Sequence, residues 1–159
     1  QQDSTFDYLI VASGSGATHI GLVAGMSLLS PSTKVIGSCV RRDEEMQTER
    51  FRLLCELINY FSDCPNFLTE RDIFLWDKAL EPGYGQIGPL AQNAMKLMAQ
   101  NEGHLLDPVY TAKSFAAVPG LISDGIIGVG SRVLYVHTGG NAAIFAYQNE
   151  MQEIMKKYI

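Results

Sequence analysis

The segment from Tyr8 to Leu29 constrains the fold of this chain more than any other. Residues 8–12 are almost wholly apolar, a glycine-rich stretch follows at 13–17, and residues 18–29 have the character of a helix. A strand that is apolar along both faces is typical of a parallel sheet, because helices cover both faces of such a sheet. We therefore expect a buried parallel strand, a tight turn and a helix that packs against the sheet.

The same alternation continues through the rest of the chain. Asp43 can cap a long helix, Pro89 suits a first helical turn, and Pro119 should kink or break the helix that contains it. The pattern predicts further strands at 34–40, 72–76 and 132–137, and further helices at 43–61, 89–101, 113–123 and 141–158. Strands that alternate with helices predict an α/β fold with a mostly parallel sheet flanked by helices.

Composition narrows the classes of partner. The chain has 159 residues, enough for one domain, and its net charge of -5 argues against nucleic acid and anionic membranes as partners. No apolar run reaches the roughly 18 residues of a membrane-spanning helix. The three cysteines lack CxxC spacing, so we expect reduced thiols and a cytoplasmic protein. The three histidines have no metal-ligand spacing, so no metal site is expected.

The glycine-rich stretch is typical of an anion site. A strand, a glycine turn and a helix direct free backbone N–H groups and the positive end of the helix dipole at a bound anion. Ser13, Ser15 and Thr18 can add hydroxyl donors. The dinucleotide fingerprint fails because His19 replaces its third glycine, the P-loop lacks its lysine, and the nucleophile elbow around Ser15 lacks both glycines. Two alternatives remain: a single phosphate group held without a lysine, or a tight turn that binds nothing.

Polar side chains also follow apolar segments in the second half of the chain. They are Tyr84, Tyr110, Thr111 and Thr138. Ligands of open α/β sheets bind beyond the carboxyl ends of the strands, so we expect these side chains to converge near the glycine loop. The alternative for each tyrosine is a half-buried ring with its hydroxyl in water.

Segments in four parts of the chain, in this order, resemble one family of enzymes. They read VASGSGATHIGLVAGM at 11–26, DIFLWDKALEPGYG at 72–85, EGHLLDPVYTAK at 102–113 and VLYVHTGGNAAIFAY at 133–147. These segments resemble the D-cysteine desulfhydrase and 1-aminocyclopropane-1-carboxylate (ACC) deaminase family. Its members use pyridoxal 5'-phosphate and have the tryptophan-synthase-β-like fold, or fold type II. The resemblance implies that residues 1–159 form the C-terminal portion of the large cofactor domain.

The resemblance also implies a role for each candidate residue. The residues that bind the phosphate of pyridoxal 5'-phosphate would be Ser13, Gly14, Ser15, Gly16, Ala17 and Thr18. Thr138 would face the pyridine nitrogen. Tyr84, Tyr110 and Thr111 would be the catalytic residues on the substrate side, with the tyrosines in acid–base or carboxylate-positioning roles.

Two positions separate the two branches of this family. Thr111 stands where deaminases typically have glutamate, and Thr138 gives HTGG where deaminases typically read HLGG. A carboxylate beside the pyridine nitrogen favours the protonated ring, which is the stronger electron sink, and threonine cannot supply that charge. The resemblance therefore implies αβ-elimination on a small amino acid, D-cysteine to pyruvate, sulfide and ammonia. ACC deaminase is the alternative activity.

The lysine that forms the Schiff base in this family lies far upstream of the phosphate loop, and no lysine here has its sequence context. We therefore expect the small domain and the Schiff-base segment to be absent from this chain, and the chain alone to be inactive. The full-length protein is expected to form a homodimer, with a complementary N-terminal segment completing this portion. A non-catalytic, lysine-free binder of a phosphorylated metabolite, or a half-domain that assembles with a partner chain, stays open.

Overall fold

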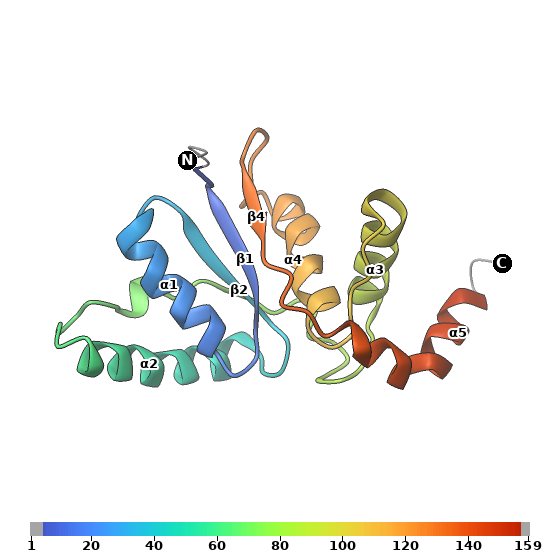
Figure 1. The fold of residues 1–159 in the computed structure, drawn as a ribbon, viewed down its shortest axis with the longest axis horizontal. Coiled ribbons are helices and arrows are strands. Elements are labelled where there is room, and N and C mark those ends of the chain that lie inside the picture. The colour runs from blue at the N-terminus through green and yellow to red at the C-terminus, as the bar shows by residue number, and fades with distance from the viewer. Residues whose placement is uncertain (1–4, 157–159) are drawn as a thin grey trace.

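The computed structural model describes residues 5–156 and confirms the expected α/β fold (Figure 1). Its sheet has four strands in the order β3-β2-β1-β4, and all the pairings are parallel. The strands are β1 (Tyr8–Ser13), β2 (Lys34–Cys39), β3 (Leu75–Trp76) and β4 (Val133–Tyr135). The α-helices are α1 (Ala17–Leu29), α2 (Glu44–Phe61), α3 (Pro89–Glu102), α4 (Thr111–Ser123) and α5 (Gln148–Lys156). The 3-10 helices are η1 (Glu70–Asp72) and η2 (Asn141–Tyr147).

Strand β1 lies between β2 and β4 at the centre of the sheet. It pairs with β2 along its whole length, from Tyr8 to Ser13. Residues 9–11 expose at most 2% of their surface, as the apolar run predicts. Because neighbouring parallel strands end at the same edge, Ser13 lies beside Cys39, the last residue of β2. The glycine loop therefore begins at the carboxyl edge of the sheet.

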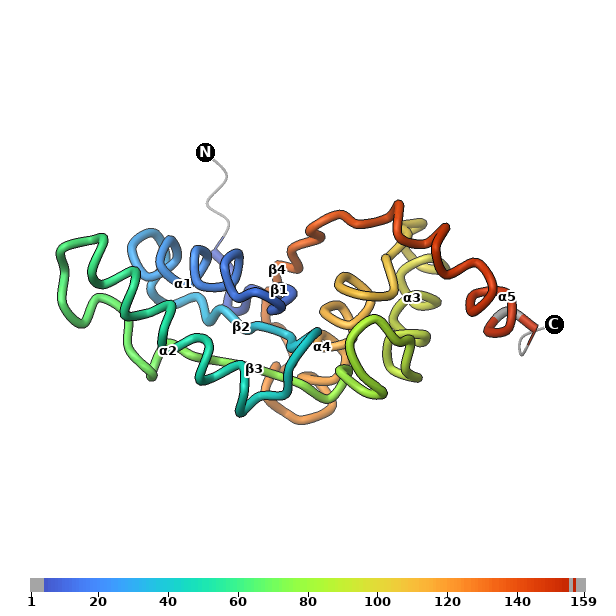
Figure 2. The backbone as a smooth tube through the Cα atoms, turned by 90° about the horizontal axis from the view of Figure 1, so that it is seen from below, coloured from blue at the N-terminus to red at the C-terminus, as the bar shows by residue number. Residues whose placement is uncertain are grey.

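Helices cover both faces of the sheet, as Figures 1 and 2 show. Successive side chains of a strand point to opposite faces. Leu9 and Val11 pack with Ile20 of α1 and Phe51 of α2 on one face. Ile10 packs against α4 on the other face, and α3 packs against α4. The alternation along β1 thus divides the apolar core into two layers.

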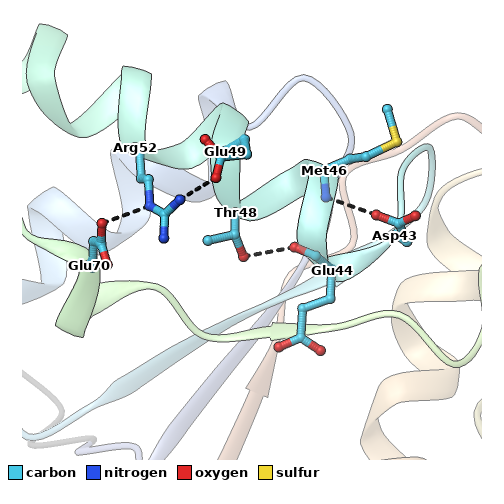
Figure 3. Close-up of polar contacts among 7 residues, drawn as sticks. All are labelled: Asp43, Glu44, Met46, Thr48, Glu49, Arg52 and Glu70. Carbon is cyan, nitrogen blue, oxygen red and sulfur yellow. Dashed lines mark hydrogen bonds and ion pairs between the residues drawn. The ribbon is translucent and has the colours of Figure 1, made fainter.

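Side chains fix the N-terminal half of α2 (Figure 3). Asp43 is the N-cap, and its carboxylate accepts a 2.8 Å hydrogen bond from the backbone N–H of Met46, as the sequence predicts. Acidic side chains follow in the first turn, where the helix dipole favours negative charge. Further along the helix, Arg52 bridges Glu49 and Glu70 and so joins α2 to η1.

Several elements begin or end differently from the sequence-based expectation, among them β3, β4 and the last helix. The strand expected at 72–76 is confined to β3. Its first expected residue, Asp72, instead belongs to η1, where it forms a capping box with Thr69. The last helix begins as the 3-10 helix η2 and becomes α-helical only at Gln148. Its expected end at Tyr158 lies outside the described residues.

Helix α4 runs through Pro119 as one helix, so the expected break is wrong. The proline itself is exposed, whereas Gly120 packs against the sheet. A Cβ atom at Gly120 would lie 2.3 Å from Cζ2 of Trp76. Ala117 and Leu121 on the same helix are also buried. Packing of this face against the core keeps the helix continuous despite the missing backbone N–H of proline.

The cysteines match the expectation from their spacing, since Cys39, Cys55 and Cys64 are all free thiols. No helix within residues 5–156 is both long and apolar enough to cross a membrane. In that same part of the chain, no three His, Cys, Asp or Glu side chains are grouped so that they could hold a metal ion.

The N-cap of α2 gives a direct test of this part of the fold. Asp43→Ala should lower the free energy of unfolding by about 1 kcal/mol, because the N–H of Met46 loses its acceptor. Urea unfolding measures the change. Asp43→Asn is the matched control, since an asparagine oxygen can still cap the helix. An equal loss in both variants would contradict the capping role.

Candidate functional site

The glycine loop connects the carboxyl end of β1 to the first turn of α1. Gly16 precedes the helix with φ of 89°, a left-handed conformation that favours glycine. A Cβ atom at this position would also lie 2.6 Å from Cδ1 of Leu54. Ser15 Oγ accepts the N–H of Ala17 at 3.3 Å. Among the described residues, the N–H groups of Ser15, Gly16 and Thr18 have no hydrogen-bond partner. The loop therefore presents free backbone donors at a helix N-terminus.

A buried cluster of hydrogen bonds supports this loop. Gln47 Nε2 donates to Ser13 Oγ at 2.9 Å, and the same oxygen lies 3.1 Å from Nδ1 of His19. All three side chains are fully buried. Burial lowers the pKa of His19 to about 3, so the ring is neutral at pH 7 and can accept the Ser13 hydroxyl proton at Nδ1. The Ser13 hydroxyl is thus directed into the protein, and only its backbone is available to a ligand.

Close packing holds His19 in this position. Its ring centroid lies 4.4 Å from that of Phe51 on α2. A Cβ atom at Gly37 of β2 would lie 2.2 Å from Nδ1 of His19, so only glycine leaves room for the ring. His19, which stands in place of the third glycine of the dinucleotide fingerprint, is therefore part of the contact between α1, α2 and the sheet.

Two arginines reach the loop from the segment after β2, and the sequence reasoning missed both. Arg42 Nη1 donates to the carbonyl oxygen of Gly14 at 2.9 Å, and Arg50 Nε donates to that of Ser15 at 3.3 Å. Arg42 Nη1 also lies 3.4 Å from Oε1 of Gln47. The partners are 28 and 35 residues apart, so no local pattern connects them. The one sequence feature that could have indicated these contacts is a basic residue, Arg42, directly before the Asp43 N-cap.

Tyr84 and Tyr110 meet beside the loop. Their hydroxyl oxygens are 2.5 Å apart, and their rings pack edge to face with centroids 6.1 Å apart. A Cβ atom at Gly14 would lie 3.5 Å from Cε1 of Tyr110, so the Tyr110 ring borders the loop. The hydrogen bond that Tyr110 shares with Tyr84 raises the pKa of Tyr110, so this phenol is protonated near neutral pH. The Arg41 guanidinium lies 5.7 Å from the centre of the Tyr84 ring.

Thr111 lies in the interior, and its hydroxyl is bonded to Asp107. Thr111 Oγ1 donates to Oδ2 of Asp107 at 2.6 Å. The same carboxylate accepts the backbone N–H groups of residues 109–111 and so caps α4. A Cβ atom at Gly140 would lie 3.0 Å from Asp107 Oδ2, so the HTGG segment packs against this carboxylate. Thr138 of that segment is exposed.

Lys113 fixes the loop that carries Tyr84. Its buried ammonium group donates to the carbonyl oxygens of Leu80 and Gly83 at 2.7 and 2.5 Å. Burial lowers the pKa of Lys113. Because Tyr110 precedes α4 and Lys113 lies in its first turn, one helix end positions both tyrosines.

The residues of the glycine loop fit a phosphate group. The side chains are small, the backbone at Gly16 has the positive φ of a tight turn, and its free N–H groups lie at the start of a helix. A comparison with known families matches residues 1–139 to the family described as pyridoxal-phosphate dependent enzymes. The chain belongs to this family. The cofactor of this family, pyridoxal phosphate, carries the single phosphate group that the loop fits, and the predicted resemblance is confirmed.

Two D-cysteine desulfhydrases are similar to the chain. It is 39% identical to a D-cysteine desulfhydrase of Klebsiella pneumoniae (strain 342) and 40% identical to one of Salmonella paratyphi C (strain RKS4594), in each case over 139 residues. Each match covers 87% of this chain and 42% of the relative. The chain therefore spans less than half the length of these relatives.

A solved structure with a similar fold is described as an ACC deaminase homologue. It superposes with a TM-score of 0.84 and 29% sequence identity, over 97% of this chain and 46% of that one. The superposition confirms the expected fold type II architecture.

The neutral, buried His19 predicts how stability depends on pH. The unfolded chain gains a proton on this ring near pH 6.5, whereas the folded chain does so only near pH 3. Acid therefore favours unfolding, and the free energy of unfolding should fall by about 1.4 kcal/mol per pH unit between these values. Urea unfolding between about pH 7 and pH 5 should give a shallower dependence for His19→Gln. Equal slopes for both proteins would contradict the buried neutral ring.

Proposed function

We propose that the protein catalyses a pyridoxal-phosphate dependent αβ-elimination on a small amino acid, D-cysteine. D-cysteine and water would give pyruvate, hydrogen sulfide and ammonia. The observation that carries this proposal is the identity of 39–40% to D-cysteine desulfhydrases over 139 residues. Threonine at 111 and 138, the two positions that separate desulfhydrases from deaminases, supports the same choice.

In this proposal the loop from Ser13 to Thr18 binds the phosphate of the cofactor. Its backbone N–H groups supply most of the donors, and the Ser15 and Thr18 hydroxyls add to them. The bound cofactor supplies an electron sink for the negative charge that develops on the substrate Cα. Thr138 would face the pyridine nitrogen without adding a charge to it.

The tyrosine pair is the proposed acid of the reaction. The Tyr110 hydroxyl is protonated at neutral pH, and it shares a 2.5 Å hydrogen bond with the Tyr84 hydroxyl. Such a hydroxyl can donate its proton to the departing sulfur or bind the substrate carboxylate. Thr111 acts through Asp107, because its hydroxyl helps to orient the carboxylate that caps the helix after Tyr110.

The lysine that holds the cofactor covalently would come from a segment other than the described one. Lys78 is paired with Asp124, Lys113 is bonded to two carbonyl oxygens, and Lys34 lies at the end of β2 away from the loop. The relatives are more than twice as long as this chain. These facts support the proposal that 1–159 is the C-terminal portion of a large cofactor domain, completed by an N-terminal segment. We further propose that the whole enzyme is homodimeric and cytoplasmic.

ACC deaminase is the second candidate activity. The superposition on an ACC deaminase homologue, with a TM-score of 0.84, favours it. The identity of 39–40% to D-cysteine desulfhydrases, and threonine at position 111 where deaminases typically have glutamate, argue against it. A non-catalytic binder without the Schiff-base lysine is the remaining alternative.

Product analysis of the whole enzyme with pyridoxal phosphate tests the proposed reaction. We expect pyruvate and sulfide from D-cysteine, and little 2-oxobutanoate from ACC. Tyr110→Phe should lower kcat by about 100-fold, because the proton donor is lost, while cofactor affinity stays unchanged. Tyr60→Phe, at an exposed tyrosine on α2, is the matched control.

Two results would reject this assignment. Bound cofactor without pyruvate from any amino acid would overturn the elimination, and a higher rate of 2-oxobutanoate formation from ACC would favour the deaminase. Borohydride reduction separates the non-catalytic alternative, because a binder that lacks the Schiff base leaves no pyridoxyl-lysine in the protein.

A further inference from the structure

The phosphate loop contains no cation of its own, yet it is bonded to two. Residues 13–18 are serine, glycine, alanine and threonine. The guanidinium groups of Arg42 and Arg50 donate to the carbonyl oxygens of Gly14 and Ser15. Hydrogen bonds in which one partner is charged are stronger than neutral ones. The direction of these two peptide groups is therefore set by side chains that lie 28 and 35 residues further along the chain.

Because the peptide unit is planar, the contacts that the arginines make with the carbonyl oxygens also fix the direction of the backbone N–H groups. In a trans peptide, the C=O of one residue and the N–H of the next point in opposite directions. The one cis bond among the described residues is at Glu81-Pro82, so both loop peptides are trans. When Arg42 holds the oxygen of Gly14, the N–H of Ser15 points away from Arg42. When Arg50 holds the oxygen of Ser15, the N–H of Gly16 points away from Arg50.

These two N–H groups are the ones that the fold leaves free. Within residues 5–156, neither the N–H of Ser15 nor that of Gly16 has a hydrogen-bond partner. A cation on the carbonyl side of a peptide polarises it, which makes the N–H on the other side a stronger donor. Two polarised donors that lie side by side at a helix N-terminus match the oxygens of one phosphate group.

We propose that Arg42 and Arg50 are positioning residues for the cofactor phosphate: they hold the Gly14 and Ser15 carbonyl groups so that the N–H groups of Ser15 and Gly16 point at the anion. This inference rests on the proposed cofactor site and names the residues that give it its affinity. It also explains how a loop without lysine binds a doubly charged group, because the positive charge acts through the peptide groups.

The contacts of the two arginines predict which of them contributes more to phosphate binding. Arg42 is half-buried, and its 2.9 Å bond to the loop is accompanied by a 3.4 Å contact to Gln47, whose amide also donates to Ser13. Arg50 is exposed, and its single contact with the loop is 3.3 Å long. Loss of Arg42 should therefore weaken phosphate binding more than loss of Arg50.

Binding of pyridoxamine 5'-phosphate tests the proposal, because this compound does not bond covalently to lysine and so reports the phosphate contacts alone. Isothermal titration of the whole enzyme, freed of its cofactor, should give about fivefold weaker binding for Arg42→Met and a smaller loss for Arg50→Met. Pyridoxamine, which lacks the phosphate, should bind all proteins equally. Arg42→Lys keeps one charged donor and should recover part of the loss.

Arg52→Met is the matched control. Arg52 lies on α2 and carries the same charge as Arg42 and Arg50. It pairs with Glu49 and Glu70 instead of the loop (Figure 3). Its removal should leave the affinity for pyridoxamine 5'-phosphate unchanged. An equal loss in Arg52→Met and Arg42→Met would assign the effect to net charge and overturn the proposal.

The amide resonances of Ser15 and Gly16 give a second measurement. Adding inorganic phosphate to the ¹⁵N-labelled protein should shift both resonances, and the shift should be lost in Arg42→Met and reduced in the exposed variant Arg50→Met. Retention of the full shift in both variants would overturn the proposal. Failure of the unmodified chain to prefer pyridoxamine 5'-phosphate over pyridoxamine would instead overturn the cofactor site. A phosphate preference that is undiminished in both variants would overturn the arginine roles alone.

Discussion

The burial of β1 on both faces is the constraint on which the rest of the structure depends. Residues 9–11 are almost wholly inaccessible, so helices must cover the strand on each side. Leu9 and Val11 require α1 and α2, and Ile10 requires α4. The strand also fixes where a ligand can be bound, because its carboxyl end opens directly into the glycine loop. A change that let β1 shift by one residue would exchange its two faces and move the loop with it.

The site is assembled from the ends of elements that this core holds in place. The loop begins where β1 ends, Tyr110 stands at the start of α4, and Arg42 precedes α2. None of these positions depends on a long flexible segment. Buried polar contacts, such as those of Ser13 with Gln47 and His19, join the end of the strand to both helices. Buried polar contacts of this kind favour one arrangement of the core over others.

The sequence predicted the elements that local pattern determines. The apolar run of β1, the glycine loop and the Asp43 cap each follow from a few neighbouring residues. Proximity of Tyr84 and Tyr110 to the loop followed from the rule that parallel strands end at one edge. The break expected at Pro119 and the longer strand expected at 72–76 were wrong, because tertiary packing and a capping box outweighed local preference. Arg42 and Gln47 were missed since their partners lie 28 and 34 residues away, and no periodicity records such a contact.

Two buried charges show how the substrate side of the site is kept rigid. Asp107 and Lys113 are both buried, yet each is satisfied by backbone groups: the carboxylate by three N–H groups, and the ammonium by two carbonyl oxygens. A buried charge that lost these partners would destabilise the fold, since its desolvation would no longer be offset. The backbone segments that provide these hydrogen-bond partners are therefore held firmly, and the same segments carry Tyr110 and Tyr84. The contact between the Tyr84 and Tyr110 hydroxyls therefore depends on where these backbone segments are fixed. A substitution of Asp107 or Lys113 would displace the tyrosine pair first.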